Sequence, residues 1–165
     1  MLIIKKKLEN IILFIVIPFV GFVADYITKQ MIIQNICVQD QVVNLLPFFR
    51  FVCVLNTGVS FGILANIENG RVILLIITVF ILIVVYFLMY KERNNFIKYC
   101  YSVIISGAFG NIIDRFLHGG VIDFLDFYYE SYHYPAFNVA DSLIFIGICG
   151  IIISQILEKK KERKS

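Results

Sequence analysis

The stretch VILLIITVFILIVVYFLMY, Val72–Tyr90, contains no charged residue and lies between Arg71 and Lys91. A helix needs roughly 20 predominantly apolar residues to cross about 30 Å of hydrocarbon, and this stretch has that length. The whole chain is similar, with 59% hydrophobic residues, 16% charged residues and a mean hydropathy of +0.84 over 165 residues. This composition excludes an ordinary soluble globule and indicates an integral membrane protein.

Three further stretches are long and apolar enough to span a membrane, so the predicted spans are roughly 8–31, 72–90, 96–117 and 137–157. The first follows lysines, as a signal peptide does, but it is longer than the ~7–15 residues of a signal-peptide core. We therefore interpret it as a retained span, with Pro18 as a candidate kink. The sequence predicts a single domain over residues 1–165, an all-α membrane protein with four transmembrane helices.

The basic residues predict the orientation, because short cytoplasmic loops are rich in Lys and Arg. They form three groups, before the first span, between the second and third, and after the fourth: Lys5, Lys6 and Lys7; Lys91, Arg93 and Lys98; Lys159, Lys160, Lys161, Arg163 and Lys164. With four spans, all three groups lie on one side. We therefore expect cytoplasmic termini and two external segments, Gln34–Arg71 and His118–Pro135.

The first external segment contains VVNLLPFFRFVCVLN, Val42–Asn56, which is rich in β-branched and aromatic residues. Such residues favour strands, so we expect a small β-rich segment between the first and second spans, against the membrane surface. In the second segment four tyrosines are expected to anchor the chain at the membrane interface, since aromatic residues collect there. They are Tyr128, Tyr129, Tyr132 and Tyr134.

The four cysteines, Cys37, Cys53, Cys100 and Cys149, do not have the spacing of a zinc site. We interpret them as packing residues, with an external Cys37–Cys53 disulfide as the alternative. The two histidines, His118 and His133, do not form the H-E-x-x-H pattern of zinc peptidases. No serine has the surroundings of a catalytic triad, and no nucleic-acid-binding motif is found. The sequence therefore predicts neither a metal nor another cofactor.

Five aspartates are expected to meet at the external end of the spans. Counted at about 1.5 Å per helical residue from the cytoplasmic lysines, Asp25, Asp114 and Asp141 reach the outer membrane boundary, about 24–27 Å away. Asp123 and Asp126 follow the third span directly. Carboxylates at this depth are costly, so they indicate a functional site.

Two close carboxylates share a proton, which leaves one acid and one base that together can activate water against a carbonyl. Asp123, Asp126 and Asp141 are the candidates, and spacing leaves open which two form the pair. Asp25 lies four residues before Lys29, and Asp114 lies beside Arg115 and within reach of a neighbouring span. For each of these two aspartates, a structural and a functional role are equally expected. GAFGN, Gly107–Asn111, supplies small residues for close helix packing.

Two other functions fit intramembrane acids. A proton-coupled transporter or channel would need a relay of carboxylates across the bilayer, whereas these are expected at one face. A noncatalytic membrane scaffold would tolerate replacement of Asp123 and Asp141.

Five stretches occur in order along the chain: DYITK (Asp25–Lys29), NTGVSFG (Asn56–Gly62), GNIIDR (Gly110–Arg115), VIDF (Val121–Phe124) and FNVAD (Phe137–Asp141). In order, spacing and topology they resemble the five motifs of the bacterial lipoprotein signal peptidases, also called signal peptidase II. The resemblance covers nearly the whole chain. Ser60 departs from it, because many relatives carry Ala there.

The resemblance implies an aspartyl endopeptidase of the bacterial cell membrane that cleaves diacylglyceryl-modified prolipoproteins just before the lipidated cysteine. It implies a site near the outer leaflet, a monomer, contact with membrane lipids, inhibition by the cyclic peptide globomycin and no nucleic-acid partner. The catalytic pair falls on Asp123 and Asp141, with Asp126 as a noncatalytic neighbour. Positions that match substrate-binding, inhibitor-binding or supporting residues are Asn56, Gly58, Asn111, Arg115, Asn138, Asp25, Lys29 and Asp114.

Overall fold

The computed structural model describes residues 2–58 and 70–163. Within them, four helical segments are long and apolar enough to cross a membrane: Lys6–Cys37, Gly70–Lys91, Asn95–His118 and Val139–Lys161. The prediction of four spans is confirmed. The last three lie close to their predicted bounds, whereas the first continues past residue 31 to Cys37.

The first span consists of four consecutive helical pieces: α1 (Leu2–Ile11), the π-helix η1 (Ile12–Val16), α2 (Ile17–Ile32) and the π-helix η2 (Ile33–Cys37). Pro18, the candidate kink, lies in the first turn of α2. Proline has no N–H for the carbonyl four residues earlier, and π-turns accommodate such a break in the helical hydrogen bonds. The irregular turn, η1, thus ends at Val16, two residues before the proline.

The other spans are α3 (Gly70–Lys91), α4 (Asn95–His118) and α5 (Val139–Glu162). Asn94 caps α4, where its side chain accepts the Phe96 and Ile97 backbone N–H groups. α4 packs against α2, α3 and α5, and it contains more buried residues than any other helix among the described residues. Gly107 lies against the backbone of Ala140 in α5, so the predicted close packing of small residues is confirmed.

A four-stranded antiparallel sheet lies at one end of the helices, in the order β1 (Val43–Leu46), β2 (Phe49–Asn56), β3 (Val121–Tyr129) and β4 (Tyr132–His133). β1 and β2 follow α2 and η2, but β3 and β4 lie between α4 and α5. The prediction of a β-rich segment only between the first two spans was therefore too narrow. Strand pairing between segments so far apart in the chain cannot be read from either segment alone.

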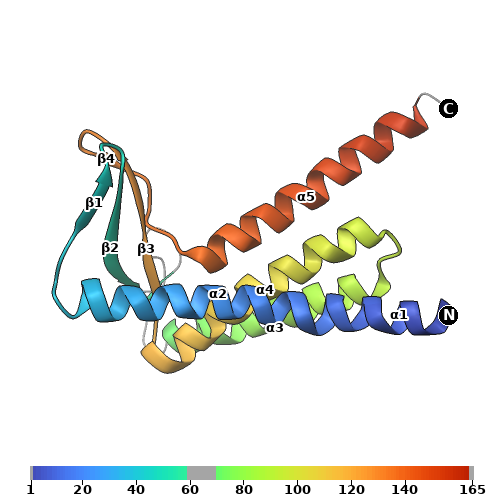
Figure 1. Ribbon diagram of the computed structural model, residues 1–165, viewed down its shortest axis with the longest axis horizontal. Helices are drawn as coiled ribbons and strands as arrows, with labels where there is room; N and C mark the ends of the chain where they lie inside the picture. Colours follow the sequence, from blue (N-terminus) through green and yellow to red (C-terminus); the bar gives the residue numbers. More distant parts are fainter. Residues whose placement is uncertain (1, 59–69, 164–165) are drawn as a thin grey trace.

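The end of the first span supports this sheet. Ile32 and Ile36 pack against Ile122 and Phe124 of β3, and these four form a buried apolar cluster. A disulfide joins Cys37 of η2 to Cys53 of β2. The alternative considered from sequence therefore replaces the packing interpretation for this pair. Figure 1 shows the sheet at one end of the molecule and the start of α1 and the end of α5 at the other.

Candidate active site

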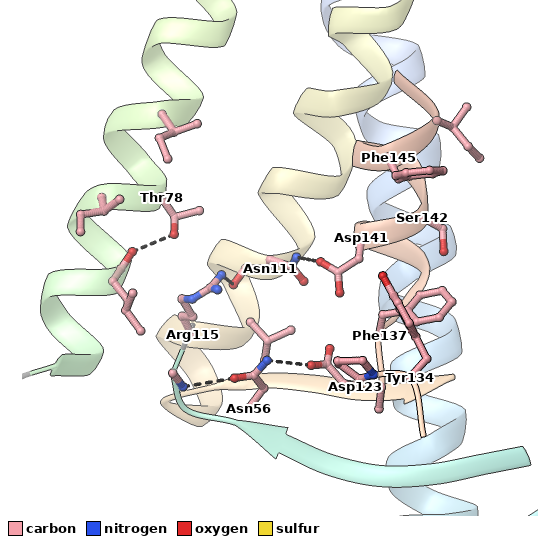
Figure 2. A pocket seen from close by; sticks show the side chains of 18 residues that line it. Asn56, Thr78, Asn111, Arg115, Asp123, Tyr134, Phe137, Asp141, Ser142 and Phe145 are labelled. Atoms are coloured by element: carbon pink, nitrogen blue, oxygen red, sulfur yellow. Dashed lines mark hydrogen bonds between the residues drawn. The ribbon is translucent and has the colours of Figure 1, made fainter. Parts of the chain in front are cut away.

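A cavity of about 880 Å³ lies where the sheet meets α3, α4 and α5. Figure 2 shows polar side chains from separate elements pointing into it. The polar residues are Asn56, Asn111, Arg115, Asp123, Asp141, Ser142 and Thr78. Apolar side chains of α3 and α5 form another part of the wall: Leu74, Ile77, Ile81, Phe145 and Ile146. The cavity therefore joins a polar end beside the sheet to an apolar wall within the spans.

Asp123 lies in β3 and is almost fully buried, at 2% exposure. Asn56 Nδ2 donates to its Oδ2 at 3.0 Å, and Asn138 Nδ2 donates to its Oδ1 at 2.7 Å. Burial raises the pKa of Asp123 to about 7, and the nearby charge of Asp141 adds to this, although the two amide donors oppose it. Asp123 thus holds a proton at a higher pH than an ordinary aspartate does.

Asp141 lies in the first turn of α5, where it forms a capping box with Asn138. The Asn138 side chain accepts the Asp141 backbone N–H at 2.8 Å, which holds the start of the helix in place. Asn111 Nδ2 donates to Asp141 Oδ1 at 2.7 Å. Figure 2 shows Asp123 and Asp141 facing the same part of the cavity from a strand and a helix.

Two further predicted residues border the same space. Arg115 lines the cavity, and its Nη1 donates to the backbone oxygen of Asn111 at 3.1 Å. The Gly58 backbone N–H donates to Asn56 Oδ1 at 3.2 Å. Because the oxygen of Asn56 is occupied in this way, its amino group is the end that faces Asp123. The remaining part of this motif, including Ser60, lies outside the described residues.

Asp25, Lys29 and Asp114 form a buried ion cluster, in which Lys29 contacts Asn111 of the cavity wall. Lys29 Nζ lies 2.7 Å from Asp25 Oδ2 and 2.8 Å from Asp114 Oδ2. The predicted pairing of Asp25 with Lys29 is confirmed. For Asp114, the structure supports the pairing with a neighbouring span, since its partner Lys29 belongs to α2.

Asp126 makes a different set of contacts. Arg50 Nε donates to its Oδ2 at 2.6 Å, and His133 Nδ1 lies 3.0 Å from its Oδ1. Although burial opposes ionisation, these two partners hold the pKa of Asp126 below its usual value. Tyr128 lies beside the cluster, with Arg50 over its ring and His133 stacked on it. These contacts join Asp126 and Tyr128 in one cluster of the sheet, and the role of the four tyrosines as interfacial anchors stays a prediction.

Sequence reasoning missed several residues of the cavity wall. Tyr134 and Phe137 line it from the segment between β4 and α5, and Thr78 lines it from α3. Phe137 is held by backbone hydrogen bonds with Leu125 of β3, as donor at 3.2 Å and acceptor at 2.8 Å. The only sequence signal for Phe137 was its place in FNVAD. Within residues 2–58 and 70–163, no group of three or more His, Cys, Asp or Glu side chains is arranged to hold a metal ion.

Several known proteins are similar to this chain. The family model described as "Signal peptidase (SPase) II" matches residues 17–157. The lipoprotein signal peptidase of Shewanella amazonensis is 38% identical to the chain, over 88% of the chain and 88% of its own length. That of Thermodesulfovibrio yellowstonii is 43% identical, over 79% of the chain and 85% of its own length.

Two solved structures are similar as well, both described as bacterial membrane enzymes studied by the in meso method. One superposes with a TM-score of 0.76 at 29% identity and covers 92% of each chain. The other has a TM-score of 0.75 at 32% identity, over 86% of this chain and 90% of its own. With four apolar helices long enough to span a membrane, a small antiparallel sheet and a family match over most of its length, the chain is a multi-pass membrane peptidase that belongs to the lipoprotein signal peptidase (signal peptidase II) family.

Proposed function

We propose that this peptidase is an aspartyl endopeptidase, that Asp123 and Asp141 are its catalytic pair, and that it cleaves diacylglyceryl-modified prolipoproteins just before the lipidated cysteine. The observation that carries the proposal is the meeting of two carboxyl groups in one cavity, each with a side-chain amide donor. The two environments differ, because Asp123 is buried and has a pKa raised to about 7 whereas Asp141 lies partly exposed at a helix N-terminus. Such a difference suits one acid and one base.

The proposed reaction starts with Asp123 protonated and Asp141 ionised. Asp141 takes a proton from a water molecule as the water oxygen attacks the carbonyl carbon of the scissile peptide bond. Asp123 gives its proton to the carbonyl oxygen, so a neutral tetrahedral diol forms. When the C–N bond breaks, Asp141 returns its proton to the leaving amine of the cysteine, and Asp123 recovers a proton from the diol. The products are the free signal peptide and the lipidated protein.

The apolar wall explains why a lipidated substrate fits. Side chains of α3 and α5, among them Ile77 and Phe145, continue the cavity from the carboxyl groups into the spans. Acyl chains on the cysteine would lie in this region or in the adjacent lipid and would hold the peptide bond near the aspartates. Binding energy far from the reacting bond can be used in this way to position it.

The proposal also includes location. In a bacterial cell membrane with cytoplasmic termini, the sheet and the cavity would lie at the outer leaflet, where the substrate's lipid enters. The basic residues at the termini and the sheet at the opposite end support this orientation. A reporter fused after Lys164 is expected to be active only in the cytoplasm, and activity outside the membrane would contradict the four-span topology.

The direct test uses the purified protein as a monomer in detergent or in lipid vesicles, with no added cofactor. It is mixed with one prolipoprotein in two forms, with and without the diacylglyceryl group, and product masses are measured. We expect loss of the signal peptide from the modified form only, and inhibition by globomycin. Equal cleavage of both forms would contradict the role of the lipid, and no cleavage of either would contradict the proposed activity.

A further inference from the structure

The buried lysine of the first span has three polar partners. Lys29 is 1% exposed, and its Nζ contacts Asp25 at 2.7 Å, Asp114 at 2.8 Å and Asn111 Oδ1 at 3.2 Å. The contact with Asn111 is a hydrogen bond, and the two contacts with the carboxylates are ion pairs. The partners of Lys29 lie on α2 and α4, and none of the three is a proposed catalytic residue.

Each of the two carboxylates also holds a backbone N–H next to a proposed catalytic aspartate. Asp25 Oδ1 accepts from the Ala140 N–H at 2.8 Å, and Ala140 directly precedes Asp141. Asp114 Oδ2 accepts from the Ile122 N–H at 3.1 Å, and Ile122 directly precedes Asp123. The two elements that carry the aspartates, α5 and β3, are thus fixed at corresponding points by carboxylates that share one cation.

The third partner orients an amide. Because Asn111 Oδ1 accepts from Lys29 Nζ and also from Asn138 Nδ2, the amino end of Asn111 is directed to Asp141, at 2.7 Å. A reversed amide would turn its oxygen toward the carboxylate of Asp141 and lose that hydrogen bond. Lys29 and Asn138 together therefore hold the orientation in which Asn111 donates to Asp141.

We infer that Lys29 is a positioning residue for hydrolysis, which places Asp123 and Asp141 relative to each other through Asp25, Asp114 and Asn111. This inference rests on the proposed function, since it assumes that the two aspartates are the catalytic pair. It goes further by connecting α2, which carries Asp25 and Lys29, to the geometry of the reaction. A merely structural ion cluster would stabilise the fold without affecting the rate per folded molecule.

Breaking a buried pair on one side is strongly destabilising, so two variants remove the charges of the cluster in steps. The first removes one charge of each sign, Lys29→Gln with Asp25→Asn, and leaves Asp114 as the remaining carboxylate of the cluster. Asparagine keeps an oxygen for the Ala140 N–H, so the contact to α5 can persist. The second variant adds Asp114→Asn and removes all three charges of the cluster.

Ser102→Ala is the matched control. The Ser102 hydroxyl is fully buried and donates to the Leu13 backbone oxygen, so it also joins the first span to α4. It lies on a different part of both helices from Lys29 and does not line the cavity. A loss of stability by itself should therefore appear in this variant without a change in chemistry.

Activity is measured per folded molecule on the lipidated prolipoprotein, with kcat and KM determined separately over a range of pH. For both Lys29 variants we expect kcat to fall about 100-fold, as for a small misplacement of reacting groups, with KM changed less than about threefold. Ser102→Ala is expected to keep the wild-type kcat.

The pH profile provides a second readout. The charged groups around Lys29 are Asp25 on its own helix, Asp114 and Arg115 on α4, Asp123 on β3 and Asp141 on α5. Among the effects on Asp123, the charge of Lys29 lowers the pKa. The upper limb of the profile should therefore move to higher pH in the Lys29→Gln, Asp25→Asn variant and stay in place in Ser102→Ala.

A wild-type kcat and pH profile in both Lys29 variants would overturn the inference. So would the failure of both to accumulate, because Lys29 would then be a requirement for folding. These outcomes differ from failure of the proposed function, in which the wild type does not cleave the substrate or Asp123→Asn and Asp141→Asn remain active.

Discussion

Asn138 holds Asp123 by a side-chain hydrogen bond of 2.7 Å, from its Nδ2 to the carboxylate Oδ1. The oxygen of the same amide accepts the Asp141 backbone N–H at 2.8 Å. One fully buried side chain therefore caps α5 and contacts both proposed catalytic residues. Its two functions use different atoms, so substitutions can separate them.

We predict that Asn138→Ser keeps the helix cap and loses the contact with Asp123, since a serine hydroxyl accepts from a helix N–H but is too short to reach the strand. Cleavage should fall at least tenfold, and thermal stability should fall less than in Asn138→Ala, although the Nδ2 contacts with Asn111 Oδ1 and the Ile122 carbonyl are lost as well. Asn138→Ala loses both contacts and should in addition destabilise the protein by about 1 kcal/mol. Thermal unfolding and the cleavage rate, measured on the same preparations, check this. Equal activity of the serine variant and the wild type would contradict a role for the contact.

The spans could be predicted because each is a long apolar stretch whose ends are marked by charges, a signal that lies within one segment. Val72–Tyr90, for example, is bounded by Arg71 and Lys91. The convergence of five aspartates at one end followed from the same counting. The presence of Asp123 and Asp141 in one cavity agrees with it, as does the buried pairing of Asp25 with Lys29.

What could not be predicted depends on contacts between distant segments. β2 pairs with β3, and this pairing places Asn56 opposite Val121 and within hydrogen-bonding reach of Asp123. The partner of Asp126 is Arg50, on the neighbouring strand. Neither segment contains a pattern that identifies its partner. The alternation of side chains along a strand shows which residues share a face of the sheet, but it does not show which strand lies alongside.

Asp126→Asn is expected to retain activity within about threefold of the wild type. At neutral pH it should be less stable by about 1–2 kcal/mol, because two charge-assisted contacts are weakened and one partner, Arg50, is partly solvated. The folded-state pKa of Asp126 lies below its ordinary value of 3.8. Its stabilising contribution is therefore present above that value and is lost as the pH falls through the folded-state pKa. Thermal unfolding of both proteins should thus differ at pH 7 and converge toward pH 3. A constant difference at all pH values would contradict the ionic contribution.

The pH dependence of cleavage follows from Asp123. Its pKa is raised by burial to about 7, and the proposed reaction needs it protonated. The rate at saturating substrate should therefore fall as the pH rises through about 7, since deprotonation removes the acid. Steady-state rates between pH 5 and pH 9, with protein integrity checked at each value, test this. A rate that continues to increase through this range would show that Asp123 does not act as the acid.

Arg115 is expected to act on the substrate side of the cavity. Its Nη1 bonds to the Asn111 backbone, and the rest of the guanidinium borders the space that contains both aspartates. A cation there can hold a substrate carbonyl or stabilise negative charge beside the catalytic pair. Arg115→Ala should reduce processing at least tenfold while the protein still inserts. Membrane content measured beside the cleavage rate separates the two effects, and a variant that fails to accumulate would indicate a structural role.

The strongest test of the catalytic pair is its non-additivity. Asp123→Asn and Asp141→Asn should each remove nearly all cleavage, and the double variant should be little worse than either, because one carboxyl group cannot complete the proton transfers without the other. Both single variants should still insert and bind globomycin, since asparagine keeps the size of aspartate. Asp126→Asn is the control, because its carboxylate is committed to Arg50 and His133. If Asp126→Asn were inactive and Asp123→Asn active, the pair would have been assigned to the wrong residues. If the two losses multiplied in the double variant, the two aspartates would not act as one unit.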